Sequence, residues 1–184
     1  MAEHEKSNEV LKGRMKKIAK ELAKYYTVKV GILAKNNYQV SENMDLAGIG
    51  AVQEYGAKIK VTDKMRNFFR YQFGVNLKKD TTEIEIPARS WLLEPIKDKE
   101  FKNLVYEYFG DETFWEEYGD KKEAKDLANM IGNIALFQIQ KAFSNGGING
   151  EWKPNSPITI TQKGSSMPLI NNGNLRGQVA FEVE

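Results

Sequence analysis

The chain has 184 residues, enough for one domain with a sizeable core but not for two of ordinary size. Hydrophobic residues make up 41% and charged residues 28%, and 27 basic against 25 acidic side chains leave a net charge of +2. This balance is ordinary for a globular protein and gives no bulk reason to expect nucleic-acid binding. The absence of cysteine excludes disulfides and thiolate metal sites, and no apolar run approaches the roughly 20 residues that a membrane helix requires. We expect a single domain over residues 1–184.

The N-terminal region predicts an amphipathic helix. Residues 1–8 are polar, and we expect them to be disordered. Apolar side chains then recur every three or four positions from Glu9 to Tyr26. The opposite face is basic from Lys12 to Lys24. We interpret that face as solvated surface, with contact to an acidic partner or a DNA backbone left open.

The following segment predicts a strand, a helix and then an excursion. Alternating apolar residues predict a half-buried strand over 27–34, and Asp45 and Gly56 can cap and end the next helix. Residues 57–86 contain two short strand patterns joined by a helical segment, so we expect them to project from the core. Pro87 ends the second strand because it has no backbone donor.

Within this excursion, aromatic and basic residues are interleaved. The basic positions run from Lys58 to Arg70, and Phe68 and Phe69 lie among them. An amphipathic helix that buries both phenylalanines is the simplest interpretation. A subunit interface is the favoured functional alternative, and a platform for nucleic-acid bases is the other.

The second half of the chain predicts further helices and a final strand. The pattern favours a long helix buried on several sides, and the fold class is α+β, with a small mixed or antiparallel sheet packed against that helix. Residues 110–119, which include Trp115, are acidic and aromatic together. The predicted elements are helices over 91–109, 121–143 and 172–176, a long irregular loop over 144–170 and a strand over 178–183.

Residues that perform catalysis are scarce. The only histidine is His4, in the N-terminal tail, which argues against His-based catalysis and His-ligated zinc. Carboxylate pairs exist, for example Glu83 with Glu85, but nothing directs two of them into one cleft. We expect no enzyme activity, no cofactor and no metal, and a carboxylate hydrolase is the weakest alternative.

Trp152 lies in the predicted irregular loop. A loop of this length is unusual unless it is functional or held in place. Trp152 and Leu169 can each fill a pocket, either in this chain or in a neighbouring one. Both possibilities stay open.

Four short stretches occur in a fixed order over residues 47–184: Ala-Val-Gln-Glu-Tyr-Gly at 51–56, Ile-Pro-Ala-Arg-Ser-Trp-Leu at 86–92, Gly-Glu-Trp-Lys-Pro-Asn-Ser-Pro at 150–157 and Pro-Leu-Ile-Asn-Asn-Gly-Asn-Leu-Arg at 168–176. Together they resemble the Mu-type virion-morphogenesis and tail-completion family of tailed phages. Residues 57–86 and 110–119 read as insertions relative to that pattern.

The resemblance implies a non-enzymatic structural protein that forms a ring, possibly a hexamer, at the head–tail junction (neck) or the tail end. It would assemble in the cytoplasm of an infected or prophage-carrying bacterium and end in the virion. Its partners would be copies of itself and other phage head–tail or tail proteins, with no membrane and no specific nucleic acid. The ring would close by heterologous pairing, in which one patch meets a different patch. The expected interface residues are Arg89, Trp91, Phe68, Phe69, Trp115, Trp152, Leu169 and Arg176.

Two further expectations concern specific contacts. Arg89 carries a planar donor fork that suits carboxylates or carbonyls, and Glu54 is a possible partner for it. The alternative function is a nucleic-acid-binding module that uses the basic surfaces Lys12–Lys24 and Lys58–Arg70.

Overall fold

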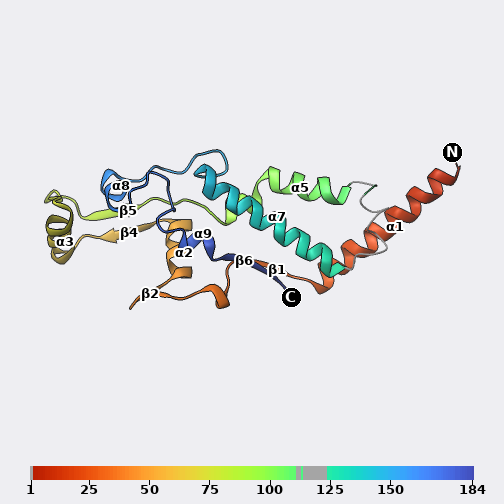
Figure 1. Ribbon diagram of the computed structural model, residues 1–184, viewed down its shortest axis with the longest axis horizontal. Helices are drawn as coiled ribbons and strands as arrows, with labels where there is room; N and C mark the ends of the chain where they lie inside the picture. The colour runs from red at the N-terminus through yellow and green to blue at the C-terminus, as the bar shows by residue number, and fades with distance from the viewer. Residues whose placement is uncertain (1, 111–112, 114–123) are drawn as a thin grey trace.

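The computed structural model describes residues 2–110, 113 and 124–184. It has an elongated body in which long helices cover an antiparallel strand pair (Figure 1). A hairpin arm projects at one end and the N-terminal helix at the other (Figure 1). The predicted α+β class, with a small antiparallel sheet against a long helix, is confirmed.

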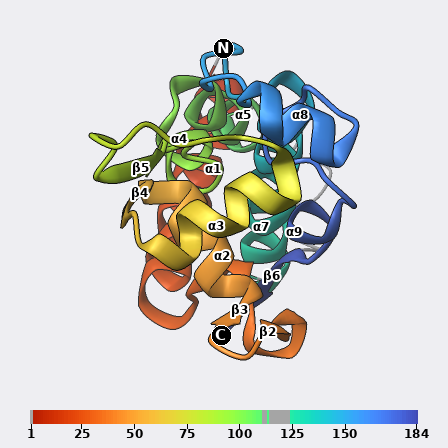
Figure 2. The same cartoon turned by 90° about the vertical axis from the view of Figure 1, so that its left-hand side faces the viewer.

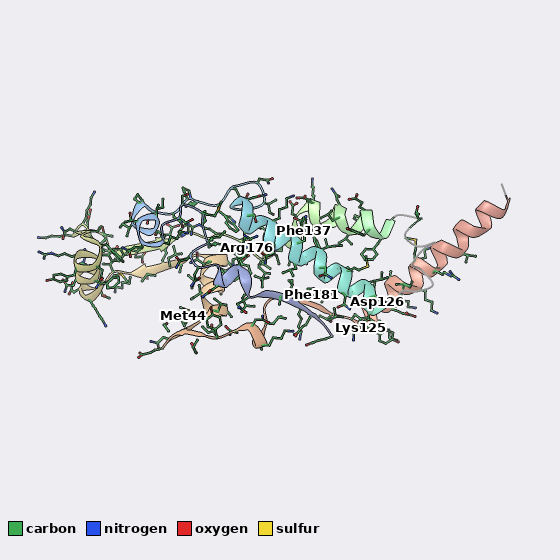
Figure 3. All side chains as sticks on the ribbon, in the orientation of Figure 1. Met44, Lys125, Asp126, Phe137, Arg176 and Phe181 are labelled. Carbon is green, nitrogen blue, oxygen red and sulfur yellow. The ribbon has the colours of Figure 1, made fainter. Side chains whose placement is uncertain are left out.

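The body is built on β1 (Val28–Ile32), β6 (Val179–Val183) and α7 (Ala124–Asn145). The two strands pair antiparallel along their whole length, and α7 packs across them. The buried residues of α7 cover about half of its circumference, and Phe137 on the other side is 59% exposed, so the predicted burial on several sides holds for one broad face only. Gly132 allows close contact here, since a Cβ at this position would lie 2.3 Å from the ring of Phe181 on β6 (Figure 3).

The N-terminal helix α1 (Ala2–Tyr25) begins before the predicted Glu9. Residues 2–8, which the sequence analysis expected to be disordered, are helical instead. Ala, Glu and Lys dominate that stretch and favour helix without any apolar stripe. Within the described residues, no helix is both long enough and apolar enough to cross a membrane.

Helix α2 (Leu46–Tyr55) follows the short helix η1 (Ala34–Asn36) and a small hairpin, β2 (Gln39–Ser41) with β3 (Met44–Asp45). The sequence pattern did not predict the hairpin. Asp45 caps α2 as predicted, because its Oδ1 accepts from the Gly48 N–H at 2.7 Å. Gly56 ends the helix with a φ of 73°. A Cβ at Gly56 would lie 2.8 Å from the backbone of Ile86 and Ala88, so glycine also allows the chain to cross itself here.

The predicted excursion is a two-stranded arm. β4 (Ala57–Lys60) pairs antiparallel with β5 (Glu83–Ile86), from Ala57 opposite Ile86 to Lys60 opposite Glu83. Helix α3 (Asp63–Phe73) lies at the tip and begins where the Thr62 hydroxyl caps the Met65 N–H. Figure 2 looks onto this end, where α3 crosses the front of the molecule.

The helix predicted over 91–109 is two helices, α4 (Leu93–Lys97) and α5 (Lys99–Gly110). Asp98 separates them because its backbone is extended, and its carboxylate caps the Glu100 N–H at 2.8 Å. Pro95 lies in the first turn of α4, where its missing N–H costs nothing.

The segment predicted as an irregular loop over 144–170 contains helix α8 (Pro157–Lys163). Ser156 caps its start, Pro157 pre-sets the first helical residue and Gly164 ends it with a left-handed φ of 67°. These local signals outweigh the low apolar content of the stretch. A second short helix, α9 (Asn174–Gly177), leads into β6.

Candidate interaction surface

A corner joins the end of α2 to the start of α4, and Glu54 holds it. The Glu54 carboxylate is buried and accepts from the backbone N–H groups of Trp91, Leu92 and Leu93 at 2.8, 2.9 and 3.2 Å. It also accepts from the Ser90 hydroxyl. Leu93 is the first residue of α4, Trp91 and Leu92 immediately precede it, and the next N–H, that of Glu94, donates to the Ser90 hydroxyl at 3.0 Å. Glu54 therefore caps that helix from a different part of the chain.

Two tryptophans pack behind this corner. The Trp91 ring is 3% exposed and donates its Nε1–H to the Gly50 carbonyl at 2.8 Å. Trp152 is 7% exposed, donates to the Ser90 carbonyl and meets the Phe143 ring edge to face. Both indoles are thus satisfied inside this chain. Trp152 therefore fills a pocket in the core of its own chain and not in a neighbouring one.

Arg89 connects the corner to the C-terminal segment. It is 6% exposed, and its guanidinium donates to the carbonyls of Lys153 and Pro154 at 2.8 and 3.2 Å. The expected Glu54–Arg89 pair is wrong, because Glu54 binds the backbone of α4 and Arg89 binds backbone carbonyls. Arg89, Trp91 and Trp152, expected as interface residues, are instead buried parts of the corner.

The C-terminal segment is held by side chains that bind its own backbone. Lys163 donates to the carbonyls of Met167 and Ile170, and Asn155 donates to those of Ser166 and Met167. These bonds tie α8 to the turn that carries Leu169, whose φ is 58°. No sequence pattern marks Lys163 or Asn155 for this role, because any Lys or Asn can bind nearby carbonyls.

A groove of about 1110 Å³ opens between the arm, α2 and the C-terminal segment. Its walls come from Phe69 and Phe73 on α3, Ile84 on β5, Leu46 on α2 and Ile158 on α8. Leu169 also lines it and packs against the core. In Figure 2, α3 and α8 flank this end of the molecule. The groove is therefore mainly apolar and joins segments that are far apart in sequence.

The charged groups of this groove are mostly cationic. Its lining holds Arg89, Lys153 and Lys163 against one carboxylate, Glu85, which lies 4.0 Å from Lys153 in an exposed pair. Among the described residues, Arg89 and Lys163 make no ion pair within 4.0 Å. Burial lowers the pKa of Arg89, and burial followed by repulsion from Arg89 lowers the pKa of Lys163. Two desolvated cations thus face the groove with carbonyl partners and no carboxylate.

The arm tip carries an aromatic cluster. Phe68, Phe69 and Phe73 meet edge to face with ring centroids 5.3–6.2 Å apart. Phe68 nevertheless stays 52% exposed, and Tyr71 beside it is 78% exposed. Burial of both phenylalanines, the simplest interpretation of the sequence, is therefore wrong, because Phe68 is exposed and Phe69 is only half-buried.

Arg66 shows that the basic residues of the arm are not equivalent. Its guanidinium donates to the carbonyls of Leu77, Lys78, Lys79 and Thr81, and so it closes the loop between α3 and β5. The lysines of the arm are exposed, and so are Lys16, Lys17, Lys20 and Lys24 on α1. The two basic surfaces named for nucleic acid lie at opposite ends of the molecule (Figure 1).

The remaining expected interface residues have different surroundings. Arg176 lies on α9 beside α7, where it donates to Gln140 and to the Ser144 hydroxyl (Figure 3). Trp115 lies outside the described residues. Of the eight expected positions, Phe69, Leu169 and the buried Arg89 line the groove, and Phe68 is exposed close by on α3.

Within the described ranges, no group of three or more His, Cys, Asp or Glu side chains is placed to hold a metal ion. Comparison with protein families, with curated proteins and with solved structures finds no match to this chain.

Proposed function

We propose that this chain is a structural protein of a tailed-phage or prophage virion, which assembles with copies of itself into a ring at the head–tail junction or the tail end. It performs no chemistry in this role. Its function is to bind neighbouring subunits and adjoining virion proteins through surfaces that a rigid corner holds in place. The virion is its final location.

The four stretches that resemble the tail-completion family support this proposal because they pack together. Glu54 of the first stretch binds the backbone of the second, and Arg89 of the second binds the carbonyl of Lys153 in the third. Leu175 of the fourth lies next to Gly50, close to the Trp91 ring. Stretches separated by up to about 120 residues thus form one structural unit, as expected if they define a common architecture.

The observation that carries the assembly role is the projecting arm. The arm projects beyond the body (Figure 1). Its helix α3 exposes Phe68 and Tyr71, and the cationic groove lies beside it. Aromatic side chains are favoured at protein interfaces, and exposing them costs solubility unless a partner covers them. An arm at one end of an elongated body suits head-to-tail contacts between unlike patches, which close into rings.

Sedimentation velocity of the purified chain, from micromolar to near-millimolar concentration, tests this proposal. We expect a discrete closed oligomer whose population rises with concentration. Phe68→Ser with Tyr71→Ser should weaken assembly while leaving the melting temperature nearly unchanged. Phe137→Ser is the matched control, because Phe137 on α7 is 59% exposed and lies away from the arm (Figure 3). Equal assembly of the arm variant and the wild type would contradict the proposal.

A nucleic-acid-binding module remains the alternative proposal, based on the exposed lysines of α1 and the arm. A gel-shift titration at two salt concentrations separates the two, because phosphate contacts weaken steeply with salt. Absence of binding at low salt would remove the alternative.

A further inference from the structure

We infer that the groove between the arm, α2 and the C-terminal segment receives the acidic–aromatic segment 111–120 of a second copy of this chain. This inference rests on the proposed self-assembly and names the two patches that meet. One patch is the groove. The other has the sequence Asp-Glu-Thr-Phe-Trp-Glu-Glu-Tyr-Gly-Asp.

Charge complementarity identifies the occupant. The groove lining carries three cations, Arg89, Lys153 and Lys163, and one anion, Glu85. Segment 111–120 carries five carboxylates and no basic residue. Arg89 is buried and both Arg89 and Lys163 have only carbonyl partners, so an arriving carboxylate would stabilise them, most strongly at Arg89, where solvent screening is weakest.

Apolar complementarity points to the same occupant. The groove walls include Phe69, Ile84 and Leu169, and segment 111–120 brings Phe114, Trp115 and Tyr118. The groove volume of about 1110 Å³ exceeds the roughly 300–1,000 Å³ of typical small-molecule sites. A groove of this size and character suits a short peptide segment with aromatic anchors.

The segment of the same chain is too short to fill the groove. The ion pair of Glu100 with Lys141 sets α5 antiparallel along α7, so Gly110 and Ala124 both point away from α8 and α3 (Figure 1). At 1.5 Å per residue, Gly110 lies about 21 Å and Ala124 about 32 Å from the C-terminal end of α7. A segment that leaves Gly110, reaches that end and returns to Ala124 must therefore cover about 53 Å. Thirteen intervening residues span at most about 50 Å when fully extended. The groove lies beyond that end of α7, so the occupant must come from another copy.

The pairing gives the assembly a direction. The groove lies beside the arm of one copy, and the ends of α5 and α7 that flank the segment in the sequence lie toward α1 (Figure 1). Unlike patches at opposite ends make a heterologous contact, which closes into a ring when the rotation allows it.

The binding test uses a fluorescein-labelled peptide of residues 109–121 and the full-length chain carrying Glu116→Lys and Glu117→Lys, so that receptor copies do not fill one another's grooves. Fluorescence anisotropy should show saturable binding that weakens with salt. Lys153→Glu in the receptor, at an exposed lysine of the groove, should weaken binding about three- to tenfold. A peptide with the same two Glu→Lys changes should bind the Lys153→Glu receptor better than it binds the Lys153 receptor. Lys102→Glu on α5, also an exposed lysine, is the control and should change neither affinity.

Absence of peptide binding to the folded receptor, shown folded by circular dichroism, would overturn the inference. Equal binding of a scrambled peptide would also overturn it, by showing that the groove accepts any acidic–aromatic partner. Sedimentation of the unmodified chain tests the proposed function separately. If the unmodified chain assembles, the peptide does not bind and the Glu116→Lys, Glu117→Lys chain assembles equally well, then the proposed ring stands and this pairing is refuted. Peptide binding by a chain that stays monomeric supports the groove and refutes self-assembly.

Discussion

Replacing Glu54 tests whether one carboxylate holds the corner. In Glu54→Gln, the amide oxygen can keep the bonds from Trp91 and Leu92, but the NH₂ group then faces the Leu93 N–H, donor against donor. One hydrogen bond to a charged group contributes about 1.5–3 kcal/mol, and the lost charge at the start of a helix adds about 0.3–1 kcal/mol. We expect the free energy of unfolding to fall by about 2–4 kcal/mol.

Glu54→Ala removes all four bonds and should cost about 4 kcal/mol or more, a large part of the 5–15 kcal/mol that typically stabilises a domain. Urea unfolding followed by tryptophan fluorescence measures both changes, since Trp91 lies directly at the corner. Glu83→Gln is the control, because Glu83 is exposed on the arm and should change stability by less than about 0.5 kcal/mol. If Glu54→Gln behaves like this control, Glu54 does not cap α4.

Three further predictions concern stability. Gly132→Ala should lower the urea midpoint, because its Cβ would lie 2.3 Å from the Phe181 ring, at a cost of about 1–3 kcal/mol. Gly13→Ala is the control, because a Cβ there would have nothing within 4 Å, and it should leave the midpoint unchanged or raise it. Trp152→Ala should cost about 3–5 kcal/mol in the same assay, since it empties a core site against Phe143, and a loss below 1 kcal/mol would mean that the indole is not packed there. The bond from Asn37 and then that from Gly48 lower the pKa of Asp45 below 3.8, so its stabilising contribution is complete above pH 3.8 and is lost as the pH falls through the lowered pKa. Asp45→Asn should therefore flatten the acid limb of a stability–pH curve, and an identical limb would contradict this assignment.

Local signals explain why much of the fold could be predicted. The caps Asp45 and Thr62 and the stop at Gly56 depend on residues within one helical turn, so the sequence contains all the information they need. The arm was predictable for a similar reason, because strand, helix and strand patterns follow one another between Gly56 and Pro87. Long burial periodicity likewise identified α7.

The corner was harder to predict because its partners are backbone groups. Glu54 and Arg89 have opposite charges, and a pairing between them was the natural hypothesis. Every residue except proline offers a backbone N–H, and every residue offers a carbonyl, so sequence gives no sign of which ones will lie opposite a buried charge. Only the fold shows that the N–H groups of α4 reach Glu54 and that the carbonyls of Lys153 and Pro154 reach Arg89.

The burial of the corner shows that its residues stabilise the fold, whereas the sequence alone did not separate that role from binding of a partner. Trp91 and Trp152 give the clearest sequence signal, yet each is less than 8% exposed and has its partners inside the chain. Such residues fix the architecture and cannot distinguish one binding partner from another. Specificity in assembly must then reside in the exposed residues that the corner supports, on the arm tip and the groove rim. Substitutions at the corner should act through unfolding, whereas substitutions such as Lys153→Glu should change affinity in a chain that stays folded.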